Sequence, residues 1–202
     1  MELILIRHGQ PERVENLDGR PADPPLSALG RTQAEEMAAW LAAEPVSALY
    51  VSPLARARQT AAPLEAALGL AAVVVDEIAE YDRSHAVYVP IEELKAAKDE
   101  RWFALTADGP ERVRWRAEVL PALDRIVEAH PGETVAAVCH GGVINAFLAA
   151  VLGVDQHVFF EPWYCGLNRV RAARAGLRSI VTVNEAPFLR RLGGPYGSGA
   201  GA

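Results

Sequence analysis

Residues 2–9 of the chain read ELILIRHG. The apolar residues 3–6 predict a short strand over residues 2–6 that is buried in a sheet and ends abruptly at Arg7. A permanent cation, an imidazole and a glycine, which permits close approach to the backbone, then follow one another as Arg7, His8 and Gly9. This order suits an anion, but the tripeptide alone fits a structural histidine in a turn better, so other parts of the chain must decide.

Apolar strands and amphipathic helices alternate along the rest of the chain. Further strands are predicted over residues 46–51, 73–75 and 134–138, with a closing hairpin over 167–172 and 177–183. Helices are predicted over residues 27–43, 52–68, 110–130 and 143–152. This alternation predicts an α/β fold, a three-layer sandwich with a mostly parallel central sheet and helices on both faces.

The length of the chain favours one domain, which we predict to span residues 1–192. Residues 81–110 interrupt the alternation with mixed charge, Pro90 and a short predicted helix over 91–98. We interpret them as an insertion or lid over one end of the sheet. Residues 193–202 are rich in Gly, Ser and Ala, which is typical of a flexible tail.

The composition excludes several classes of protein. Of the 202 residues 50% are hydrophobic and 23% charged, as in ordinary globular domains, and the net charge of −6 disfavours nucleic acid as a partner. No stretch approaches the ~18 apolar residues of a membrane span, and the first residues lack the pattern of a signal peptide. Two cysteines suit a reducing compartment better than a disulfide framework, so we expect a cytoplasmic protein that binds no membrane.

Familiar catalytic and metal-binding patterns are absent from the sequence. Cys139 precedes a glycine-rich turn, but a cysteine-dependent phosphatase needs an arginine six residues later, where this chain has Asn145. There is no G-x-S-x-G nucleophile elbow, no G-x-x-x-x-G-K-[ST] phosphate loop and no G-x-G-x-x-G fingerprint. Neither H-E-x-x-H nor C-x-x-C occurs, so no metal site is predicted.

Two further segments carry the same chemistry as the first. The segment SPLARARQT, residues 52–60, places Arg56 in the first turn of a helix that follows a predicted strand. The segment CHGG, residues 139–142, places His140 and Gly141 after another strand, where free N–H groups at a helix start attract anions. Because ligands bind beyond the carboxyl ends of strands in such sheets, the two histidines and two arginines predict a pocket for a dianion.

These segments, together with LIRHG at residues 5–9 and LSALGRTQA at residues 26–34, resemble the histidine phosphatase superfamily. The branch in question includes cofactor-dependent phosphoglycerate mutases and many small phosphatases. The likeness covers residues 3 to about 152, with the motifs in the family's order and spacing. It implies a phosphoglycerate mutase-like fold and a phosphoric monoester hydrolase that acts through a phosphohistidine.

The resemblance also implies roles for individual residues. His8 matches the nucleophile that accepts the phosphoryl group on a ring nitrogen, and His140 matches the second histidine of the phosphate cradle. Arg7 and Arg56 match the arginines that hold the phosphoryl oxygens, and Gly141 joins them as a substrate-binding residue. Catalysis of phosphoryl transfer is mostly positioning and charge stabilisation, so these side chains do the work of a metal, and no cofactor is expected.

A proton donor completes the expected site, because the leaving alkoxide must be protonated and the same group can then activate water. The segment DEIAEYD, residues 76–82, offers four carboxylates after the third predicted strand. The family spacing selects Glu80 as the catalytic acid. We interpret the other three as surface charges ahead of the insertion.

The sequence departs from the mutases of the family in two places. Val14 stands where mutases carry an asparagine that helps to hold phosphate, and the chain is short for that branch. Residues 81–86, YDRSHA, replace the family's aromatic and Glu-Gly segment, which leaves the alcohol part of the substrate open. Arg83 and His85 in this segment are either substrate contacts or surface residues.

The leading prediction is a metal-independent phosphomonoesterase that acts on a small phosphorylated metabolite through His8. The alternatives are a cofactor-dependent phosphoglycerate mutase and, from another class, a phosphoprotein or phospho-ligand binder with little activity. The presence of Arg7, Arg56, Glu80 and His140 beside His8 speaks against a silent protein. A homodimer is compatible with the sequence, since dimers are common among soluble oligomers.

Overall fold

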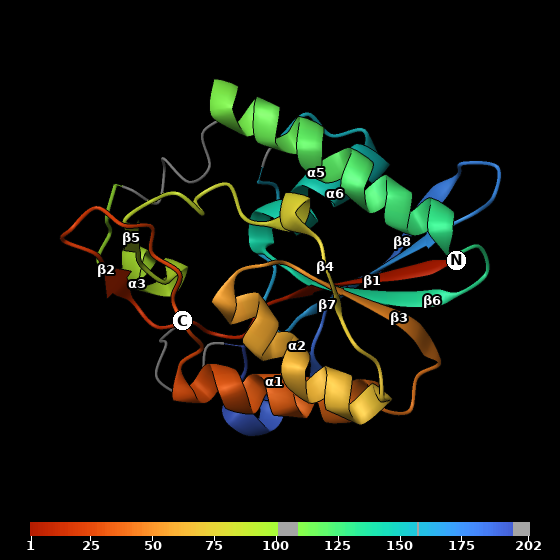
Figure 1. Cartoon of the computed structure of the whole chain (residues 1–202), viewed down its shortest axis with the longest axis horizontal. Helices are drawn as coiled ribbons and strands as arrows, with labels where there is room; N and C mark the ends of the chain where they lie inside the picture. Colours follow the sequence, from red (N-terminus) through yellow and green to blue (C-terminus); the bar gives the residue numbers. More distant parts are fainter. Residues whose placement is uncertain (101–108, 157, 196–202) are drawn as a thin grey trace.

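A six-stranded sheet in the order β4-β3-β6-β1-β7-β8 forms the middle of the computed structural model, which describes residues 1–100, 109–156 and 158–195 (Figure 1). The strands are β1 (Glu2–Arg7), β3 (Val46–Val51), β4 (Val73–Val74), β6 (Thr134–Cys139), β7 (Leu167–Ala172) and β8 (Arg178–Glu185). Neighbours among β4, β3, β6 and β1 pair in parallel, whereas β7 runs antiparallel to both β1 and β8. The mostly parallel sheet expected from the sequence is confirmed.

Helices cover both faces of this sheet, as Figure 1 shows. They are α1 (Ala28–Leu41), α2 (Ala55–Leu68) and the 3-10 helix η2 (Pro187–Leu192) on one face, and α5 (Pro110–Ala129) and α6 (Gly141–Leu152) on the other. The predicted three-layer α/β sandwich is therefore confirmed. In the described part of the chain, none of the helices has the length and hydropathy needed to cross a lipid bilayer.

The apolar run of β1 serves both layers at once. Ile4 and Ile6 belong to the hydrophobic cluster under α1 and α2, and Leu3 and Leu5 belong to the cluster under α5 and α6. All four side chains are fully buried. Successive side chains of a strand point to opposite faces, so a central strand covered on both faces needs an unbroken apolar run.

Local signals set the ends of the helices. The Ser27 hydroxyl caps α1 by accepting a hydrogen bond of 3.0 Å from the N–H of Gly30. Gly69 and Gly153 end α2 and α6 in the left-handed conformation, with φ of 66° at both. Pro110 occupies the first position of α5, where its missing N–H costs nothing.

The segment interpreted as an insertion holds small elements that stand apart from the main sheet. They are β5 (Val87–Tyr88) and α3 (Ile91–Ala96), and β5 pairs antiparallel with β2 (Val14–Glu15). The 3-10 helix η1 (Asp76–Ile78) precedes this segment. A two-residue strand carries no periodicity, so the sequence does not predict β2 or β5. Part of the insertion (101–108) and most of the predicted tail (196–202) lie outside the described residues, and the division into one domain, a lid and a tail stays a prediction.

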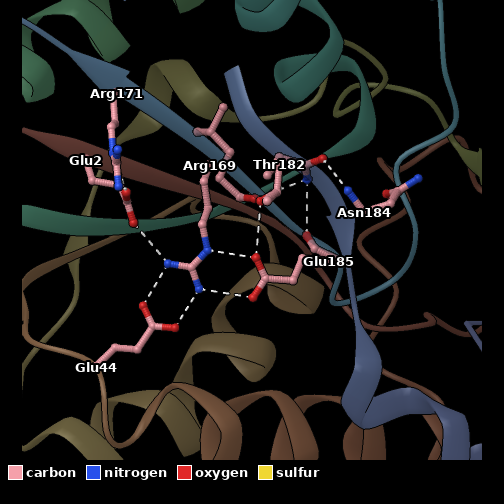
Figure 2. Close-up of polar contacts among 10 residues, drawn as sticks. Glu2, Glu44, Arg169, Arg171, Thr182, Asn184 and Glu185 are labelled. Atoms are coloured by element: carbon pink, nitrogen blue, oxygen red, sulfur yellow. Dashed lines mark hydrogen bonds and ion pairs between the residues drawn. The ribbon is translucent and has the colours of Figure 1, made fainter. Parts of the chain in front are cut away.

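One buried cation ties β7 to three other parts of the chain. Figure 2 shows the Arg169 guanidinium facing the carboxylates of Glu2, Glu44 and Glu185. It donates two hydrogen bonds to Glu44 at 2.5 and 2.7 Å, and others to Glu185 at 2.9 Å and to Glu2 at 3.0 Å. The chain separations of 16, 125 and 167 residues make this cluster a long-range link between β1, the α1–β3 turn and the end of β8.

Replacement of Arg169 by methionine should lower the free energy of unfolding by roughly 2–4 kcal/mol, because three partly buried carboxylates lose their shared cation. Urea unfolding at neutral pH measures this change. Arg171→Met is the matched control on the same strand, since the Arg171 side chain is 70% exposed and makes one contact of 3.3 Å to Glu2. It should cost less than about 1 kcal/mol. Equal losses in the two variants would contradict a stabilising role for the Arg169 cluster.

Candidate active site

The two histidines selected from the sequence leave the sheet side by side. The register pairs Arg7 of β1 with Cys139 of β6, so the following residues, His8 and His140, emerge at the same edge. Their ring centroids lie 5.1 Å apart. Ser52 follows β3, the other neighbour of β6, so the carboxyl ends of three adjacent strands converge there.

His8 is buried and held in one orientation. Its Nδ1 lies 2.8 Å from the carbonyl oxygen of Gly9, which can only accept, so Nδ1 carries the ring proton. The lone pair then resides on Nε2, and the Nε–H of Arg56 points at it from 3.3 Å. Burial, followed by the charges of Arg56 and Arg7, lowers the pKa of His8 well below its usual value. At physiological pH the imidazole is neutral, the form in which Nε2 can act as a nucleophile.

Arg7 is a buried cation beside this ring, oriented by groups from the other end of the chain. Its Nη1 donates to the carbonyl oxygen of Pro162 at 2.6 Å, and its guanidinium lies 4.0 Å from the centre of the Tyr164 ring. Tyr164 in turn donates its hydroxyl hydrogen to Glu92 of α3 at 2.9 Å. These contacts fix the plane of the guanidinium fork next to His8.

Arg56 is the second buried cation and projects from the first turn of α2. Its guanidinium lies 4.7 Å from the ring centre of Tyr88. Two carboxylates stand near it at long range, Asp82 at 3.5 Å and Asp23 at 3.9 Å. A phosphoryl dianion offers the same fork shorter, bidentate hydrogen bonds.

His140 is fully buried against His8 and does not itself line the cavity described below. Its Nε2 lies 2.7 Å from the hydroxyl oxygen of Ser52, whereas Nδ1 has no hydrogen-bond partner among the described residues. Burial lowers the pKa of His140, and the charges near it, first that of Arg56, lower the pKa further. If Ser52 donates to Nε2, the neutral ring presents Nδ1–H as a donor for an oxygen of the ligand.

Glu80 lies at the start of α6, directly against its backbone. One carboxyl oxygen accepts the N–H of Gly142 at 2.8 Å, and the other accepts the N–H of Tyr81 at 3.2 Å. A Cβ on Gly142 would stand 2.2 Å from Glu80 Oε1, so the close approach requires glycine there. Burial, and after it the negative charge of Asp82, raises the pKa of Glu80 to about 7. A carboxyl group with this pKa can donate a proton and later accept one near neutral pH.

Thr60 and Gly30, to which the sequence assigns no role, hold the loop that follows His8 in place. The N–H of Gly9 donates to the Thr60 hydroxyl at 2.9 Å, and that hydroxyl donates to the carbonyl of Arg56 at 2.7 Å. A Cβ on Gly9 would meet the Gly30 carbonyl oxygen at 2.5 Å, and one on Gly30 would meet that of Gln10 at 2.0 Å. The available signals are a glycine inside a helix that is otherwise rich in alanine and a threonine one turn after Arg56.

A cavity of about 1440 Å³ opens over these groups. Five of the predicted site residues line this cavity, so the structure brings them together: Arg7, His8, Arg56, Glu80 and Gly141. Of the two open positions in the insertion, His85 lines the cavity. Arg83 and Val14 do not: Arg83 is exposed, and Val14 pairs with Tyr88 between β2 and β5.

Cys139 and Cys165 are both buried free thiols, and burial raises the pKa of each. A protonated thiol is a poor nucleophile, which agrees with the missing cysteine-phosphatase motif. Within residues 1–100, 109–156 and 158–195, no three or more His, Cys, Asp or Glu side chains are grouped to hold a metal ion.

Comparison with known proteins shows to which family this chain is similar. The model of the histidine phosphatase superfamily (branch 1) matches residues 3–185. Phosphoserine phosphatase 1 of Hydrogenobacter thermophilus is 29% identical over 178 residues, which are 80% of this chain and 81% of that protein. A probable phosphoglycerate mutase of Yersinia enterocolitica is 27% identical over 200 residues, with 94% and 88% of the two chains covered.

A solved structure shares the fold at lower identity. The mycobacterial glucosyl-3-phosphoglycerate phosphatase in complex with VO3 superimposes with a TM-score of 0.72 at 23% identity, over 91% of this chain and 98% of that one. The expected phosphoglycerate mutase-like architecture is confirmed. With the family model matching nearly the whole chain, this protein belongs to branch 1 of the histidine phosphatase superfamily.

Proposed function

We propose that this protein is a metal-independent phosphomonoesterase that acts on a small phosphorylated metabolite through a phosphohistidine on His8. The observation that carries the proposal is the state of His8. Its Nδ1 proton is committed to the Gly9 carbonyl oxygen, and its Nε2 faces the guanidinium of Arg56. The nucleophilic nitrogen and the cations for the phosphoryl oxygens therefore share one buried site.

The proposed reaction has two displacements. Nε2 of His8 attacks phosphorus in line while the P–O bond to the alcohol breaks, and Glu80 gives its proton to the departing alkoxide. The Glu80 carboxylate then takes a proton from water, and the resulting hydroxide attacks the phosphohistidine. The N–P bond breaks, inorganic phosphate leaves, and both residues return to their starting states. Arg7, Arg56 and Nδ1–H of His140 hold the phosphoryl oxygens throughout, with Gly141 at the start of α6.

Named relatives support a small metabolite as the substrate class. Phosphoserine phosphatase 1 of Hydrogenobacter thermophilus is a relative by sequence, and an α-ribazole-5′-P phosphatase, described as putative for Escherichia coli, shares the fold with a TM-score of 0.70 at 21% identity. The proposal extends to a cytoplasmic location, which the two buried free thiols support.

A phosphoglycerate mutase is the second candidate, since one relative is a probable phosphoglycerate mutase. Such an enzyme would isomerise phosphoglycerate in the presence of a bisphosphorylated primer and release little phosphate. The mutase asparagine is replaced by Val14, which pairs within the small β2–β5 sheet and does not line the cavity. This arrangement favours hydrolysis over isomerisation.

Replacement of His8 by alanine should abolish phosphate release from p-nitrophenyl phosphate. We expect a loss in kcat/KM of roughly 10³-fold or more, because the covalent route is removed. The assay is run in excess EDTA, in which the wild-type activity should persist. His130→Ala is the matched control, since His130 bonds Tyr50 and Glu133 outside the cavity and should retain activity. Phosphate release by the His8→Ala variant at the wild-type rate would overturn the proposal. So would a wild-type protein that releases no phosphate but isomerises phosphoglycerate in the presence of a bisphosphorylated primer.

Asp82→Asn should move the basic limb of the pH profile of kcat/KM to lower pH. Glu80 acts as the acid in its protonated form, so activity is retained below its pKa of about 7 and falls as the pH rises through it. Removal of the Asp82 charge lowers the pKa of Glu80, and we expect a displacement of roughly half a unit to one unit.

The control for this experiment is Glu77→Gln. Glu77 is an exposed carboxylate three residues before Glu80, and it pairs with Arg125 at 2.6 Å outside the cavity. Titration of the substrate phosphate affects the pH profiles of the wild type and both variants equally. Only a difference between these profiles therefore reports on Glu80. A basic limb that stays fixed in Asp82→Asn, or that moves equally in Glu77→Gln, would contradict the coupling between Asp82 and Glu80.

A further inference from the structure

The cavity is far larger than its phosphate cradle requires. Its volume of about 1440 Å³ exceeds the range of roughly 300–1,000 Å³ that is usual for small-molecule sites. Besides the cradle, three segments line it: residues 85–94 with β5 and the start of α3, the first turn of α5, and residues 158–162. Most of the space is therefore available to the alcohol part of the ester.

The first of these segments supplies aliphatic side chains. Val87, Val89, Ile91 and Leu94 come from the β5–α3 segment, and Leu94 is buried. Val87 is 43% exposed, although it is a large apolar residue. Exposed apolar side chains that line a cavity indicate a binding site for an apolar ligand group.

The third segment adds an aromatic wall that the fold holds in place. The rings of Phe159 and Phe160 line the cavity with centroids 5.0 Å apart. The buried side chain of Asn145, on α6, accepts the N–H of Phe159 at 3.0 Å and that of Phe160 at 3.3 Å through Oδ1. The same helix starts beside Glu80, so the aromatic wall and the proton donor share one support.

Charges on the outer walls occur in both signs. Glu161 forms an ion pair with Lys95 of α3. The guanidinium of Arg112 stacks 4.1 Å from the centre of the Tyr81 ring, and Arg114 is an exposed residue of α5 that also lines the cavity. Outside the cradle, the carboxylates of Asp82, Glu111 and Glu161 share the described lining with Arg112 and Arg114. A carboxylate on the leaving group would be desolvated there and would meet these like charges, whereas an uncharged apolar group would not.

We propose that the preferred substrates are phosphate monoesters of bulky, uncharged, apolar primary alcohols or aromatic alcohols. This inference rests on the proposed phosphomonoesterase function and specifies its substrate class. The cradle binds the phosphoryl dianion, and the alcohol gains from contact with the valine, leucine and phenylalanine walls. O-phosphoserine and 3-phosphoglycerate, whose charged groups lie two or three bonds from the ester, gain nothing from such walls.

The test uses esters whose leaving groups are all primary alkoxides, so that chemical reactivity differs little along the series. They are ethyl, butyl, hexyl and 2-phenylethyl phosphate, compared with O-phosphoserine and 3-phosphoglycerate. We expect kcat/KM to rise roughly threefold for each methylene from ethyl to hexyl, because each CH₂ is transferred from water to an apolar wall. Hexyl and 2-phenylethyl phosphate should exceed both charged esters by about tenfold or more.

Val87→Asp removes part of this wall at an exposed position. The variant should lower kcat/KM for hexyl phosphate about tenfold and that for ethyl phosphate less than threefold, since a carboxylate beside the chain must be desolvated. Val183→Asp on β8 is the matched control: that valine is 48% exposed, lies on a strand and does not line the cavity. It should leave the whole series unchanged. Circular dichroism and thermal unfolding check that both variants are folded.

Calorimetric binding of ethyl- and hexylphosphonate, which cannot be hydrolysed, separates this inference from the proposed function. Tighter binding of the hexyl compound without hydrolysis of any ester would uphold the apolar subsite and overturn the phosphatase function. Hydrolysis with no dependence on chain length, or with preference for a charged ester, would overturn the apolar subsite alone. Equal effects of Val87→Asp and Val183→Asp would also contradict the proposed location of the subsite.

Discussion

The backbone pairs that align β1 with β6, from Glu2 with Thr134 to Arg7 with Cys139, decide where both histidines leave the sheet. Residues 3–6 are apolar on both faces, so hydrophobicity alone does not choose this register. In the observed register, Ile4 and Leu5 stand beside Ala136 and Ala137, whose small side chains leave room for their larger neighbours. A slip of one residue would move Arg7 away from Cys139 and so separate the His8 ring from that of His140.

Close placement of these rings beside Arg7 and Arg56 has an electrostatic consequence. Burial and two cations favour the neutral imidazole, so the fold prepares a nucleophile without a proton on Nε2. The same residue type serves another purpose in β7, where Arg169 contacts three carboxylates at 2.5–3.0 Å and joins distant segments. Among the described residues, the carboxylates nearest to Arg56 stand at 3.5 and 3.9 Å, a spacing that leaves room for a better anion.

The sequence predicted the layers and the central site because their signals are local. An unbroken apolar run followed by Arg7 and His8 predicts a buried strand with a polar end, and the order of elements then brings the strand ends together. The two-residue strands β2 and β5 escape prediction, since pairing and not periodicity defines them. Contacts between residues far apart in the chain, such as Ser52 with His140, escape it because no spacing encodes them.

Chemistry and recognition come from different parts of this fold. Strand ends and the first turns of α2 and α6 supply the proposed nucleophile and the cations, whereas residues 85–94 supply much of the apolar wall. Asp82 lies where the two meet, since it stands 3.5 Å from Arg56, raises the pKa of Glu80 and begins the insertion. A change at Asp82 would therefore act both on the surroundings of Arg56 and on the pKa of Glu80, the proposed proton donor. Under the proposed mechanism, the fit of the leaving group and its protonation meet at this one residue, so a substitution of Asp82 should change the pH dependence of the reaction as well as the binding of the ester.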